Sequence, residues 1–565
     1  MNNEHSESLL VHFRRIEALR SEAIDLQSID LSPRQLCDLE LLLNRGFYPL
    51  VGYLNKKEYD SVVATMRLPS GEVWPMPINL DIKQSLAETI KPGERLALND
   101  QEGFLLAILT VDDIWRPNKS VEAQAIYGTD DPTLHQGVMQ LYDRNADWYV
   151  GGTLEGVSLP IHYDFRELRL SPSETARAFT MNGWRRVLGF HTDDYLHCAH
   201  REMALNAARE HGAALFLHPV ADLTHPGALE YYTQIRCYQA FARKFPSNML
   251  KLGLTPFASR KAGPIEALWQ AITRKNFGCS HFMVAPDHAD PLTRGDSIKR
   301  FYPLESAQEL VARYAKETGI EMVPQLRMGY QQSTKKYIAL DVSNDSDLST
   351  ISSTELRHKL LNDEQIPEWF SYPEVVAELQ KSFPPRSKQG FTIFLTGFSG
   401  SGKSTIAKVL LVKFMEMNDR PVTLLDGDIV RQNLSSELTF SKEHRNLNIT
   451  RIGFVASEIT KNGGIALCAP IAPYEESRQA NRALISSYGG YIEVHVATPF
   501  EICEQRDRKG LYAKARAGKL QGVTGITDPY ITPSKPELSI DTSDISPMEA
   551  VQEILLYLEE QGYLN

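Results

Sequence analysis

The pattern of apolar and polar positions changes near residue 165, and the change predicts two kinds of architecture. Before it, glycine and proline separate short apolar runs such as RGFYPLVGYL, LPSGEVWPMPINLDI and FLLAILTVDDIW, which is typical of a β-rich unit. From Ser171 onward, apolar runs such as RRVLGF and AALFLHPV alternate with amphipathic stretches such as 199–210. This alternation predicts the strands and helices of a parallel α/β sheet.

The alternating pattern starts again after SFPPRSKQG, where paired prolines and small polar residues indicate a linker. The later apolar runs are FTIFLTG, PVTLLDGD, GIALCAP, YIEVHVAT and ELSIDT, which predict a second doubly wound parallel sheet. A shorter segment before the linker contains the helical patterns STELRHKLL and PEVVAELQ. We therefore predict an α/β multidomain chain with parts at residues 1–165, 166–320, 321–385 and 386–565.

Composition narrows the class of protein. The chain has 565 residues, and at about 150 residues per domain this length fits three or four folded units. A net charge of −11 predicts no nucleic-acid partner. No apolar run approaches the ~18 to 20 residues of a membrane span, and MNNEHSESLLVHFRR has no secretory apolar segment, so we expect a cytoplasmic protein without a membrane partner. Six scattered cysteines fit buried thiols in a reducing compartment.

The clearest chemical motif is the glycine-rich run that follows FTIFLT and precedes a helical pattern. It matches GxxxxGK[ST], in which backbone N–H groups surround phosphate oxygens at a helix N-terminus. Lys403 is expected to neutralise the β and γ phosphates, and the Ser404 hydroxyl to bind Mg²⁺. The predicted ATP-binding residues are Gly397, Phe398, Ser399, Gly400, Ser401, Gly402, Lys403, Ser404 and Thr405.

Carboxylates and basic residues follow this motif. Asp426 and Asp428 end the second strand, where one carboxylate binds Mg²⁺ and the other orients or deprotonates the attacking hydroxyl. After Phe440, a predicted helix places Arg445 and Asn448 on its polar face, which suits a nucleotide base and a phosphate, although an ordinary helix face has the same pattern. The basic stretch 506–519 predicts a lid over phosphates, and a solvated surface is the alternative.

Together, GFSGSGKST, LDGDIVR, FSKEHRNLNITRIG, APIAPY and CEQRDRKGLYAKARAGKLQGVTGITDPY closely resemble adenosine 5′-phosphosulfate (APS) kinase. The resemblance implies transfer of the ATP γ-phosphoryl group to the 3′-hydroxyl of APS, with catalytic Lys403, Asp426 and Asp428 and with Mg²⁺ at Ser404 and Asp426. It implies APS contacts from Asp428, Ile429, Val430, Arg431, Phe440, Arg445, Asn448, Ile471, Ala472, Lys509, Gly522 and Val523. The chain departs from the family at Ile429, Thr439 and Ala472, and Val523 replaces a base-stacking phenylalanine.

The larger part of the chain, from about Leu31 to Leu379, resembles ATP sulfurylase. The matching strings include LNRGFYPLVGYL, HPVADLTHPGALEYYTQIRCYQ and KAGPIEALWQAITRKNFGCSHF. This resemblance implies a PUA-like N-terminal domain, a nucleotidyltransferase sheet at 166–320 and a small subdomain at 321–385, followed by the P-loop kinase at 386–565. It also implies the small-molecule substrates ATP and APS and a homo-oligomer, either a dimer or a hexamer.

The sulfurylase signatures are altered in this chain. The family's Gln-Thr-Arg-Asn-Pro-x-His-x-x-His reads HTDDYLHCAH, and Gly-Arg-Asp-His-Ala-Gly reads APDHAD. Carboxylates thus stand where sulfate needs an arginine and an amide, which predicts an inactive site. The residues of this altered site are His191, Asp193, Asp194, His197, His200, Asp287 and His288. A zinc site at His197 and His200 is an alternative interpretation.

Three functions follow from these patterns. The first is an APS kinase whose sulfurylase-like part serves assembly or regulation. The second is a bifunctional enzyme that also makes APS from ATP and sulfate. The third is a regulatory protein that senses nucleotide, against which the intact Lys403, Ser404, Asp426 and Asp428 argue.

Overall fold

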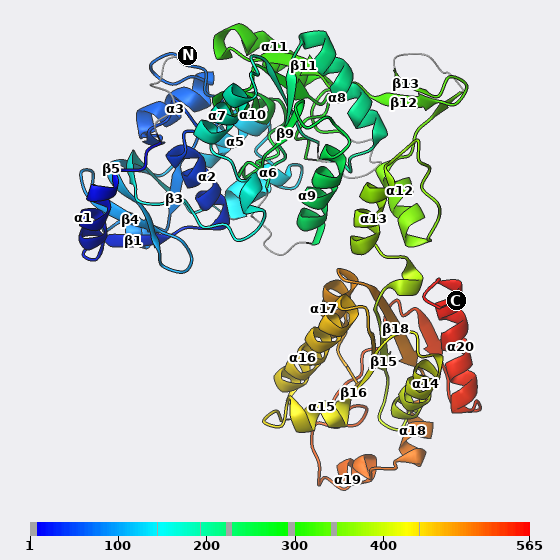
Figure 1. Cartoon of the computed structure of the whole chain (residues 1–565). Helices are drawn as coiled ribbons and strands as arrows, with labels where there is room; N and C mark the ends of the chain where they lie inside the picture. Colours follow the sequence, from blue (N-terminus) through cyan, green and yellow to red (C-terminus); the bar gives the residue numbers. More distant parts are fainter. Residues whose placement is uncertain are drawn as a thin grey trace. The chain divides into compact units, whose positions relative to one another are not determined.

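The chain divides into two compact units, drawn in Figure 1. The computed structural model describes residues 8–143, 145–192, 194–221, 229–291, 300–340, 347–439 and 441–564. The N-terminal unit comprises Met1–Lys359 and Gln365–Ser382, and the C-terminal unit comprises Leu360–Glu364 and Phe383–Asn565. The main part of the second unit therefore starts at the predicted proline-rich linker.

The N-terminal unit begins with a six-stranded, mostly antiparallel sheet in the order β1-β4-β5-β6-β2, with β3 also paired to β6. Leu96 and Leu98 of β4 alternate with residues on the other face and are buried in the core. This arrangement confirms the predicted β-rich start. The strands are β1 (Gln27–Asp30), β2 (Gly52–Tyr53), β3 (Leu80–Ile82), β4 (Arg95–Asn99), β5 (Leu105–Trp115) and β6 (Trp148–Gly156). The helices are α1 (Phe13–Ala23), α2 (Pro33–Leu43), α3 (Lys56–Thr65), α4 (Gln84–Ala87), α5 (Lys119–Tyr127) and α6 (Gln136–Asp143).

A five-stranded parallel sheet follows in the order β11-β10-β7-β8-β9, which confirms the predicted α/β pattern. Its strands are β7 (Val187–Phe190), β8 (Ala214–Leu217), β9 (Leu250–Leu252), β10 (His281–Val284) and β11 (Glu321–Pro324). Its helices are α7 (Pro172–Met181), α8 (Cys198–His211), α9 (Leu229–Ala242), α10 (Gly263–Asn276) and α11 (Ser306–Thr318). The predicted boundary at 320 is wrong by one strand, because β11 pairs with β10 and belongs to this sheet. The short run EMVP carries little periodic signal of its own.

A small antiparallel sheet and two helices complete the N-terminal unit. The sheet has the order β13-β12-β14, with β12 (Met328–Gln331), β13 (Lys336–Ala339) and β14 (Leu348–Ser349). The helices are α12 (Ser353–Leu361) and α13 (Pro373–Ser382). Val375 and Leu379, four residues apart on α13, are both buried, as an amphipathic helix requires.

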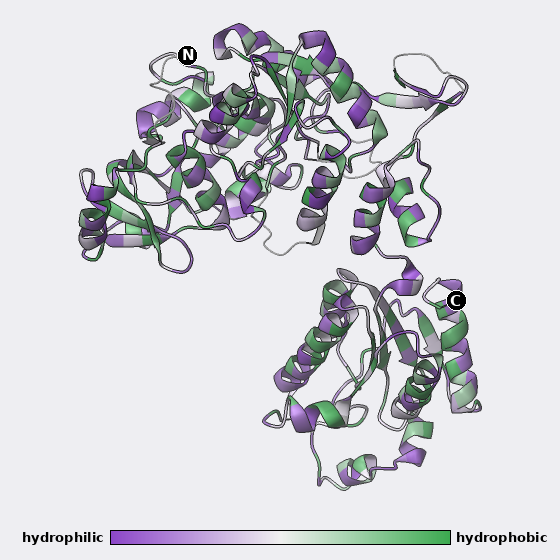
Figure 2. Cartoon of the chain, in the orientation of Figure 1, coloured by the Kyte–Doolittle hydropathy of each residue, from purple (hydrophilic) through white to green (hydrophobic). Residues whose placement is uncertain are grey.

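The C-terminal unit is a parallel sheet in the order β16-β17-β15-β18-β19, which confirms the second doubly wound pattern. Phe391, Ile393 and Leu395 of β15 pack toward α14 and α20, whereas Phe394 packs on the opposite side with residues of α16. Figure 2 colours the ribbon by hydropathy, and hydrophobic and hydrophilic segments alternate along the helices of this unit. The strands are β15 (Phe391–Thr396), β16 (Val422–Asp426), β17 (Ile465–Ala469), β18 (Gly490–Val496) and β19 (Leu538–Ile540). The helices are α14 (Lys403–Met417), α15 (Gly427–Asn433), α16 (Lys442–Lys461), α17 (Glu475–Ser486), α18 (Phe500–Arg506), α19 (Leu511–Arg516) and α20 (Pro547–Glu560).

Two further features concern the cysteines and the lengths of the helices. All six cysteines are buried free thiols. In the described part of the chain, every helix is too short or too polar to cross a bilayer.

Candidate functional site

The glycine-rich run forms a tight loop between β15 and α14. Gly397, Gly400 and Gly402 have φ angles of 147°, 83° and 102°, which lie in the region that favours glycine. A Cβ at Gly397 would lie 2.5 Å from the carbonyl oxygen of Val496, so even alanine would clash with backbone there. The loop ends at the N-terminus of α14, where N–H groups and the helix dipole favour bound phosphate.

Lys403 is the first residue of α14, and its side chain is buried against the loop. Its Nζ donates a hydrogen bond to the carbonyl oxygen of Phe398 at 2.6 Å. Burial lowers the pKa of Lys403 to about 8; Lys509 adds to this shift, whereas Cys503 and Asp426 oppose it. An incoming polyphosphate would stabilise the protonated, charged form of Lys403, because opposite charge favours that form.

Asp426 lies at the carboxyl end of β16, at the sheet edge where β15 leads into the loop. Its side chain is buried and contributes to the electrostatic environment of Lys403. The hydroxyl of Ser404 and the carboxylate of Asp426 are oxygen donors, which are the ligands that Mg²⁺ prefers, so both residues fit the predicted ion. The side chain of Asp428, in α15, is outside the described residues.

Helix α16 presents Arg445 and Asn448 from a buried face, and this face is joined to the loop 522–528. Arg445 donates hydrogen bonds to Thr524 Oγ1 at 2.9 Å and to Asp528 Oδ2 at 2.6 Å, and also to the carbonyl oxygen of Gly522. Tyr474 Oη donates to the same Asp528 oxygen at 2.8 Å. In contrast, Asn448 Oδ1 is buried without a hydrogen-bond partner among the described residues, which suits a ligand donor.

The other predicted APS contacts are spread over three segments. Arg431 donates to the carbonyl oxygens of Leu438 and Thr439, at 3.2 and 3.4 Å. Ala472 is buried with φ of 47°. The remaining residues are exposed Ile429 and Lys509, buried Val430, and half-buried Ile471, Gly522 and Val523, while Phe440 lies outside the described residues.

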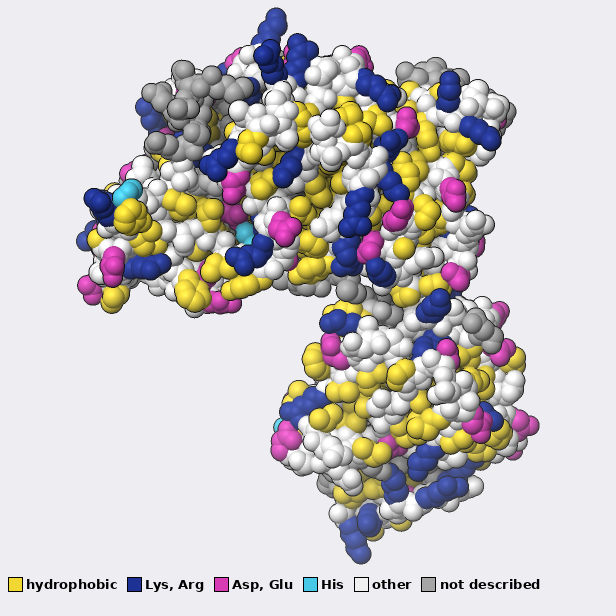
Figure 3. All heavy atoms as spheres, in the orientation of Figure 1, with side chains coloured by type: hydrophobic (Ala, Val, Ile, Leu, Met, Phe, Trp, Pro, Cys, Tyr) yellow, Lys and Arg dark blue, Asp and Glu magenta, His cyan; other side chains and the backbone are white. Residues whose placement is uncertain are grey.

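The basic stretch 506–519 begins at the last residue of α18 and contains α19, which contacts the glycine-rich loop. Tyr512 Oη donates a 2.8 Å hydrogen bond to the carbonyl oxygen of Ser399, and the ring is buried. Figure 3 shows Lys and Arg side chains gathered at the end of the C-terminal unit where Figure 1 labels α18 and α19. The exposed members of this patch are Arg508, Lys509, Lys514, Arg516 and Lys519. The alternative of a solvated surface does not account for the tyrosine contact.

Several residues that hold this site together were not predicted from the sequence. Thr524 and Asp528 lie in GVTGITDPY, and Tyr474 ends APIAPY, so these strings carry the resemblance without indicating any contact with Arg445. Residues 445 and 528 are 83 positions apart, and local periodicity carries no signal for such a pair.

For the APS kinase activity that the resemblance implies, we predict that Asp528→Asn raises the KM for APS by roughly tenfold or more and changes kcat less, because a charge-assisted hydrogen bond that positions Arg445 is lost. Steady-state kinetics with varied APS measures the effect. Asp544→Asn, an exposed carboxylate of the same unit, serves as the control. An unchanged KM would exclude a positioning role for Asp528.

The N-terminal unit has a second candidate site at the carboxyl edge of its parallel sheet. His191, which follows β7, and Arg274 of α10 both donate to Gln270 Oε1, at 2.8 and 3.0 Å. The rings of His191 and His288 lie 5.3 Å apart. Arg274 is fully buried and also donates to the carbonyl oxygen of His218 at 3.1 Å. Gln270 and Arg274 were not predicted as site residues. They lie in KAGPIEALWQAITRKNFGCSHF, which resembles ATP sulfurylase but does not by itself indicate which residues form a site.

The altered signatures are distributed around this edge. Burial lowers the pKa of His197 to about 4. The pKa of His200 is lowered well below its usual value, mainly by burial and also by the neighbouring His197. Both imidazoles are therefore neutral near pH 7. Asp194 is exposed and Asp193 lies outside the described residues. Asp287 pairs with Arg300 and Arg327 at 3.5 and 3.7 Å. The zinc alternative gains no support, since no cluster of three ligands forms at His197 and His200 among the described side chains.

The two sites define the chain's class: a P-loop phosphotransferase joined to a nucleotidyltransferase-like α/β unit. Three protein families match successive parts of the chain. They are a PUA-like domain at residues 3–159, ATP-sulfurylase at 166–382 and adenylylsulphate kinase at 389–541. The chain belongs to the sulfate adenylyltransferase family in which an ATP-sulfurylase part is fused to an APS kinase part.

Individual relatives are similar over nearly their whole length. The sulfate adenylyltransferase of Chaetomium globosum is 47% identical, over 97% of this chain and 96% of that protein. That of Mycosarcoma maydis is 46% identical over 98% of each. A solved structure described as a hexameric APS kinase from Thiobacillus denitrificans is 38% identical with a TM-score of 0.81, covering 99% of this chain and 98% of that one.

Proposed function

We propose that this protein is an APS kinase, which transfers the γ-phosphoryl group of ATP to the 3′-hydroxyl of adenosine 5′-phosphosulfate and releases ADP and the 3′-phosphorylated product. The observation that carries the proposal is that Asp528 holds Arg445 in place on the same helix as Asn448, whose Oδ1 has no hydrogen-bond partner among the described residues. Both lie in a unit whose sheet edge holds the glycine-rich loop and Asp426. The full-length relative from Thiobacillus denitrificans is described as an APS kinase, which supports the same activity.

The chain's own residues divide the work of the transfer. Backbone N–H groups of residues 397–404 hold the phosphates, and Lys403 neutralises charge that develops on the transferred group. Asp426 and Asp428 share two roles, binding Mg²⁺ and orienting or deprotonating the acceptor hydroxyl. Ser404 and Asp426 would hold Mg²⁺, which offsets phosphate charge when bound. Arg445 and Asn448 bind the acceptor nucleotide, and α19 excludes water.

A coupled assay of ADP formation tests the proposal. The purified full chain with Mg²⁺ and ATP is expected to form ADP at a rate that depends on APS, and chelation of Mg²⁺ is expected to stop the reaction. ADP formation that is equal with and without APS would contradict the proposal. A nucleotide sensor would bind ATP without any turnover.

We predict that Val523→Phe tightens APS binding by up to about tenfold, because it supplies a second aromatic face opposite Phe440. Titration of both proteins with APS measures the effect. Val523→Leu is the matched control, since it adds bulk without a ring. Unchanged or weaker affinity in the phenylalanine variant would mean that the loop 522–528 does not reach the base.

Sulfate adenylyltransferase activity is a second candidate function of the same chain. Relatives 46–47% identical over nearly their whole length carry that name, which favours the bifunctional alternative over an inactive N-terminal unit. The residues argue the other way, since Asp193 and Asp194 replace an arginine and an amide. The buried Arg274 beside His191 supplies one cationic group at this edge.

Sulfate-dependent exchange of pyrophosphate into ATP decides between these two functions. Exchange above the sulfate-free background, lost in Arg274→Met, would establish the bifunctional enzyme. No exchange in a protein that forms ADP from ATP and APS would leave kinase activity alone. The assay is independent of the kinase assay because it contains no APS.

We further propose that the chain forms a homo-oligomer, either a dimer or a hexamer. The relative from Thiobacillus denitrificans is described as hexameric and covers 99% of this chain. Native mass spectrometry of the full chain measures the state, and a monomer at micromolar concentration would contradict the proposal.

A further inference from the structure

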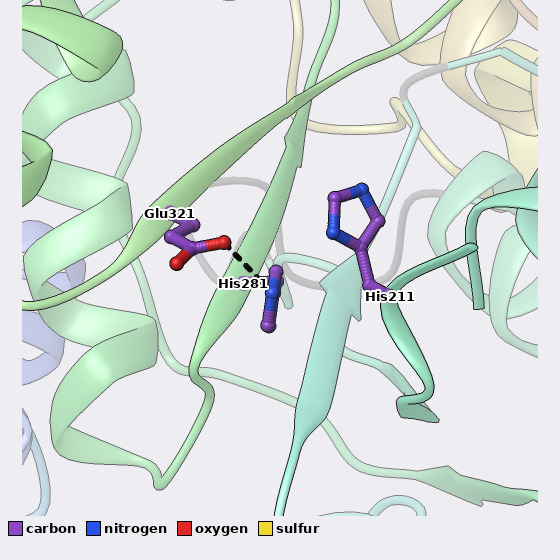
Figure 4. Close-up of side chains that lie close together, drawn as sticks. All are labelled: His211, His281 and Glu321. Atoms are coloured by element: carbon purple, nitrogen blue, oxygen red, sulfur yellow. Dashed lines mark ion pairs between the residues drawn. The ribbon is translucent and has the colours of Figure 1, made fainter. Parts of the chain in front are cut away.

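The described side chains contain a compact group of possible metal ligands that belongs to neither candidate site. His211 ends α8, His281 begins β10 and Glu321 begins β11. Their ligand atoms all lie within 4.8 Å of one another. Figure 4 shows the His281 ring between the other two side chains, with its ion pair to Glu321 dashed.

The topology of the sheet creates this group. His281 and Glu321 are directly paired residues of adjacent parallel strands, so their side chains project on the same side. His211 approaches because α8 ends just before β8, and Arg186 holds this end by donating to the carbonyl oxygen of His211 at 3.1 Å. The group therefore lies at the amino edge, whereas His191 lies at the carboxyl edge, roughly 10 Å away along a four-residue strand.

The hydrogen bonds of His281 leave one ring nitrogen directed at a carboxylate. Nδ1 lies 2.8 Å from Ser280 Oγ, which accepts from the backbone N–H of Val187 at 3.0 Å and lies 3.3 Å from its carbonyl oxygen. When the Nδ1 proton is donated to the serine oxygen and the serine hydroxyl donates to that carbonyl, Nε2 presents a lone pair. Glu321 Oε2 lies 3.0 Å from Nε2, so a cation at this point would satisfy both atoms.

Neutral imidazole and carboxylate are the forms that bind metals. The carbonyl end of α8 adds negative potential beside His211, which favours a cation.

We propose that His211, His281 and Glu321 bind one divalent transition-metal ion of the Zn²⁺ class, with water completing its coordination. Two imidazoles and one carboxylate are a known zinc donor set, and imidazole ligands favour Zn²⁺ over Mg²⁺. The ion joins the end of α8 to β10 and β11, so it stabilises the N-terminal unit and takes no part in phosphoryl transfer.

Binding requires a small inward movement. Ligand atoms of a tetrahedral zinc site lie about 3.4 Å apart, so the group must contract by roughly 1.4 Å at its widest. The side chain of Glu321 is 70% exposed and His211 is half-buried at a helix end, so both have room to adjust. His281, whose side chain is 6% exposed, is the fixed member.

Zinc binding by the full chain tests the proposal. Chelator-treated protein is titrated with Zn²⁺, and bound equivalents are counted by atomic emission after dialysis. His281→Gln is expected to lose one equivalent, with affinity reduced by more than the ~10- to 100-fold typical of losing an outer-shell partner. Zn²⁺ should also raise the melting temperature of the unaltered protein and not of this variant.

Two further variants keep the result decisive. Glu321→Gln changes an exposed side chain and weakens binding even where His281→Gln fails to fold. His162→Gln removes a histidine that pairs with Glu40 at 2.7 Å and should keep the full zinc content. Equal zinc content in all three variants and the unaltered protein would overturn the proposal, as would equal losses in all three. APS-dependent ADP formation should be the same in all four proteins.

Discussion

Replacing Lys403 with alanine is expected to reduce APS-dependent ADP formation by ~100-fold or more, because one preorganised donor to the developing charge is lost. The structure holds Lys403 in place for this role, since its ammonium group rests on the loop that surrounds the phosphates, with Nζ 2.6 Å from the carbonyl oxygen of Phe398. The measurement is kcat and kcat/KM at saturating Mg²⁺.

Lys408 provides the matched control for this prediction. It lies on the same helix, α14, but is exposed, so Lys408→Ala should retain nearly full turnover. Circular dichroism of both variants verifies the fold. A Lys403→Ala protein that keeps more than about a tenth of the unaltered rate would remove this lysine from the mechanism.

The parts of the fold and site that the sequence predicts are those that local chemistry determines. The glycines and the lysine of the run 397–404 are close together in the sequence, and a strand and a helix flank the run directly. The loop is therefore predictable without tertiary information. The alternating apolar runs similarly predict both parallel sheets. Asp426 follows from its place at a strand end.

The unpredicted parts depend on residues that meet only after folding. Arg445 contacts Asp528, and His281 contacts Glu321, across 83 and 40 positions. No spacing rule connects such pairs, since each lies in a different element. The same reason explains the misplaced boundary at residue 320. EMVP can be assigned to the larger sheet only from its pairing with β10, which is seen in the folded structure.

Replacing Arg478 with methionine is expected to destabilise the C-terminal unit by about 3–5 kcal/mol, the cost of breaking a buried ion pair from one side. Arg478, in α17, is fully buried, and its Nε lies 3.0 Å from Glu493 Oε1 in β18. Burial already raises the pKa of Glu493. Without Arg478, this carboxylate keeps its ion pair with Arg482, at 3.1 Å, and loses the more deeply buried of its two cations.

The same substitution should also impair the site, because Arg478 donates to the carbonyl oxygen of Ala472 at 2.6 Å and so fixes a predicted APS contact. Unfolding is followed by calorimetry, using the transition that ATP shifts, and a fall of roughly 10 °C is expected for a unit of this size. Arg516→Met, which breaks an exposed pair with Glu504, should leave the transition in place.

A double variant separates the lost charge pairing from lost packing. If the cost arises from a buried carboxylate that has lost one of its two cations, Arg478→Met combined with Glu493→Gln should be more stable than Arg478→Met alone, because a neutral amide is less costly to bury than a charge. A double variant that is less stable by the sum of the single effects would show that the two residues act independently. The contact between Arg478 of α17 and Glu493 of β18 would then contribute through packing rather than through charge pairing.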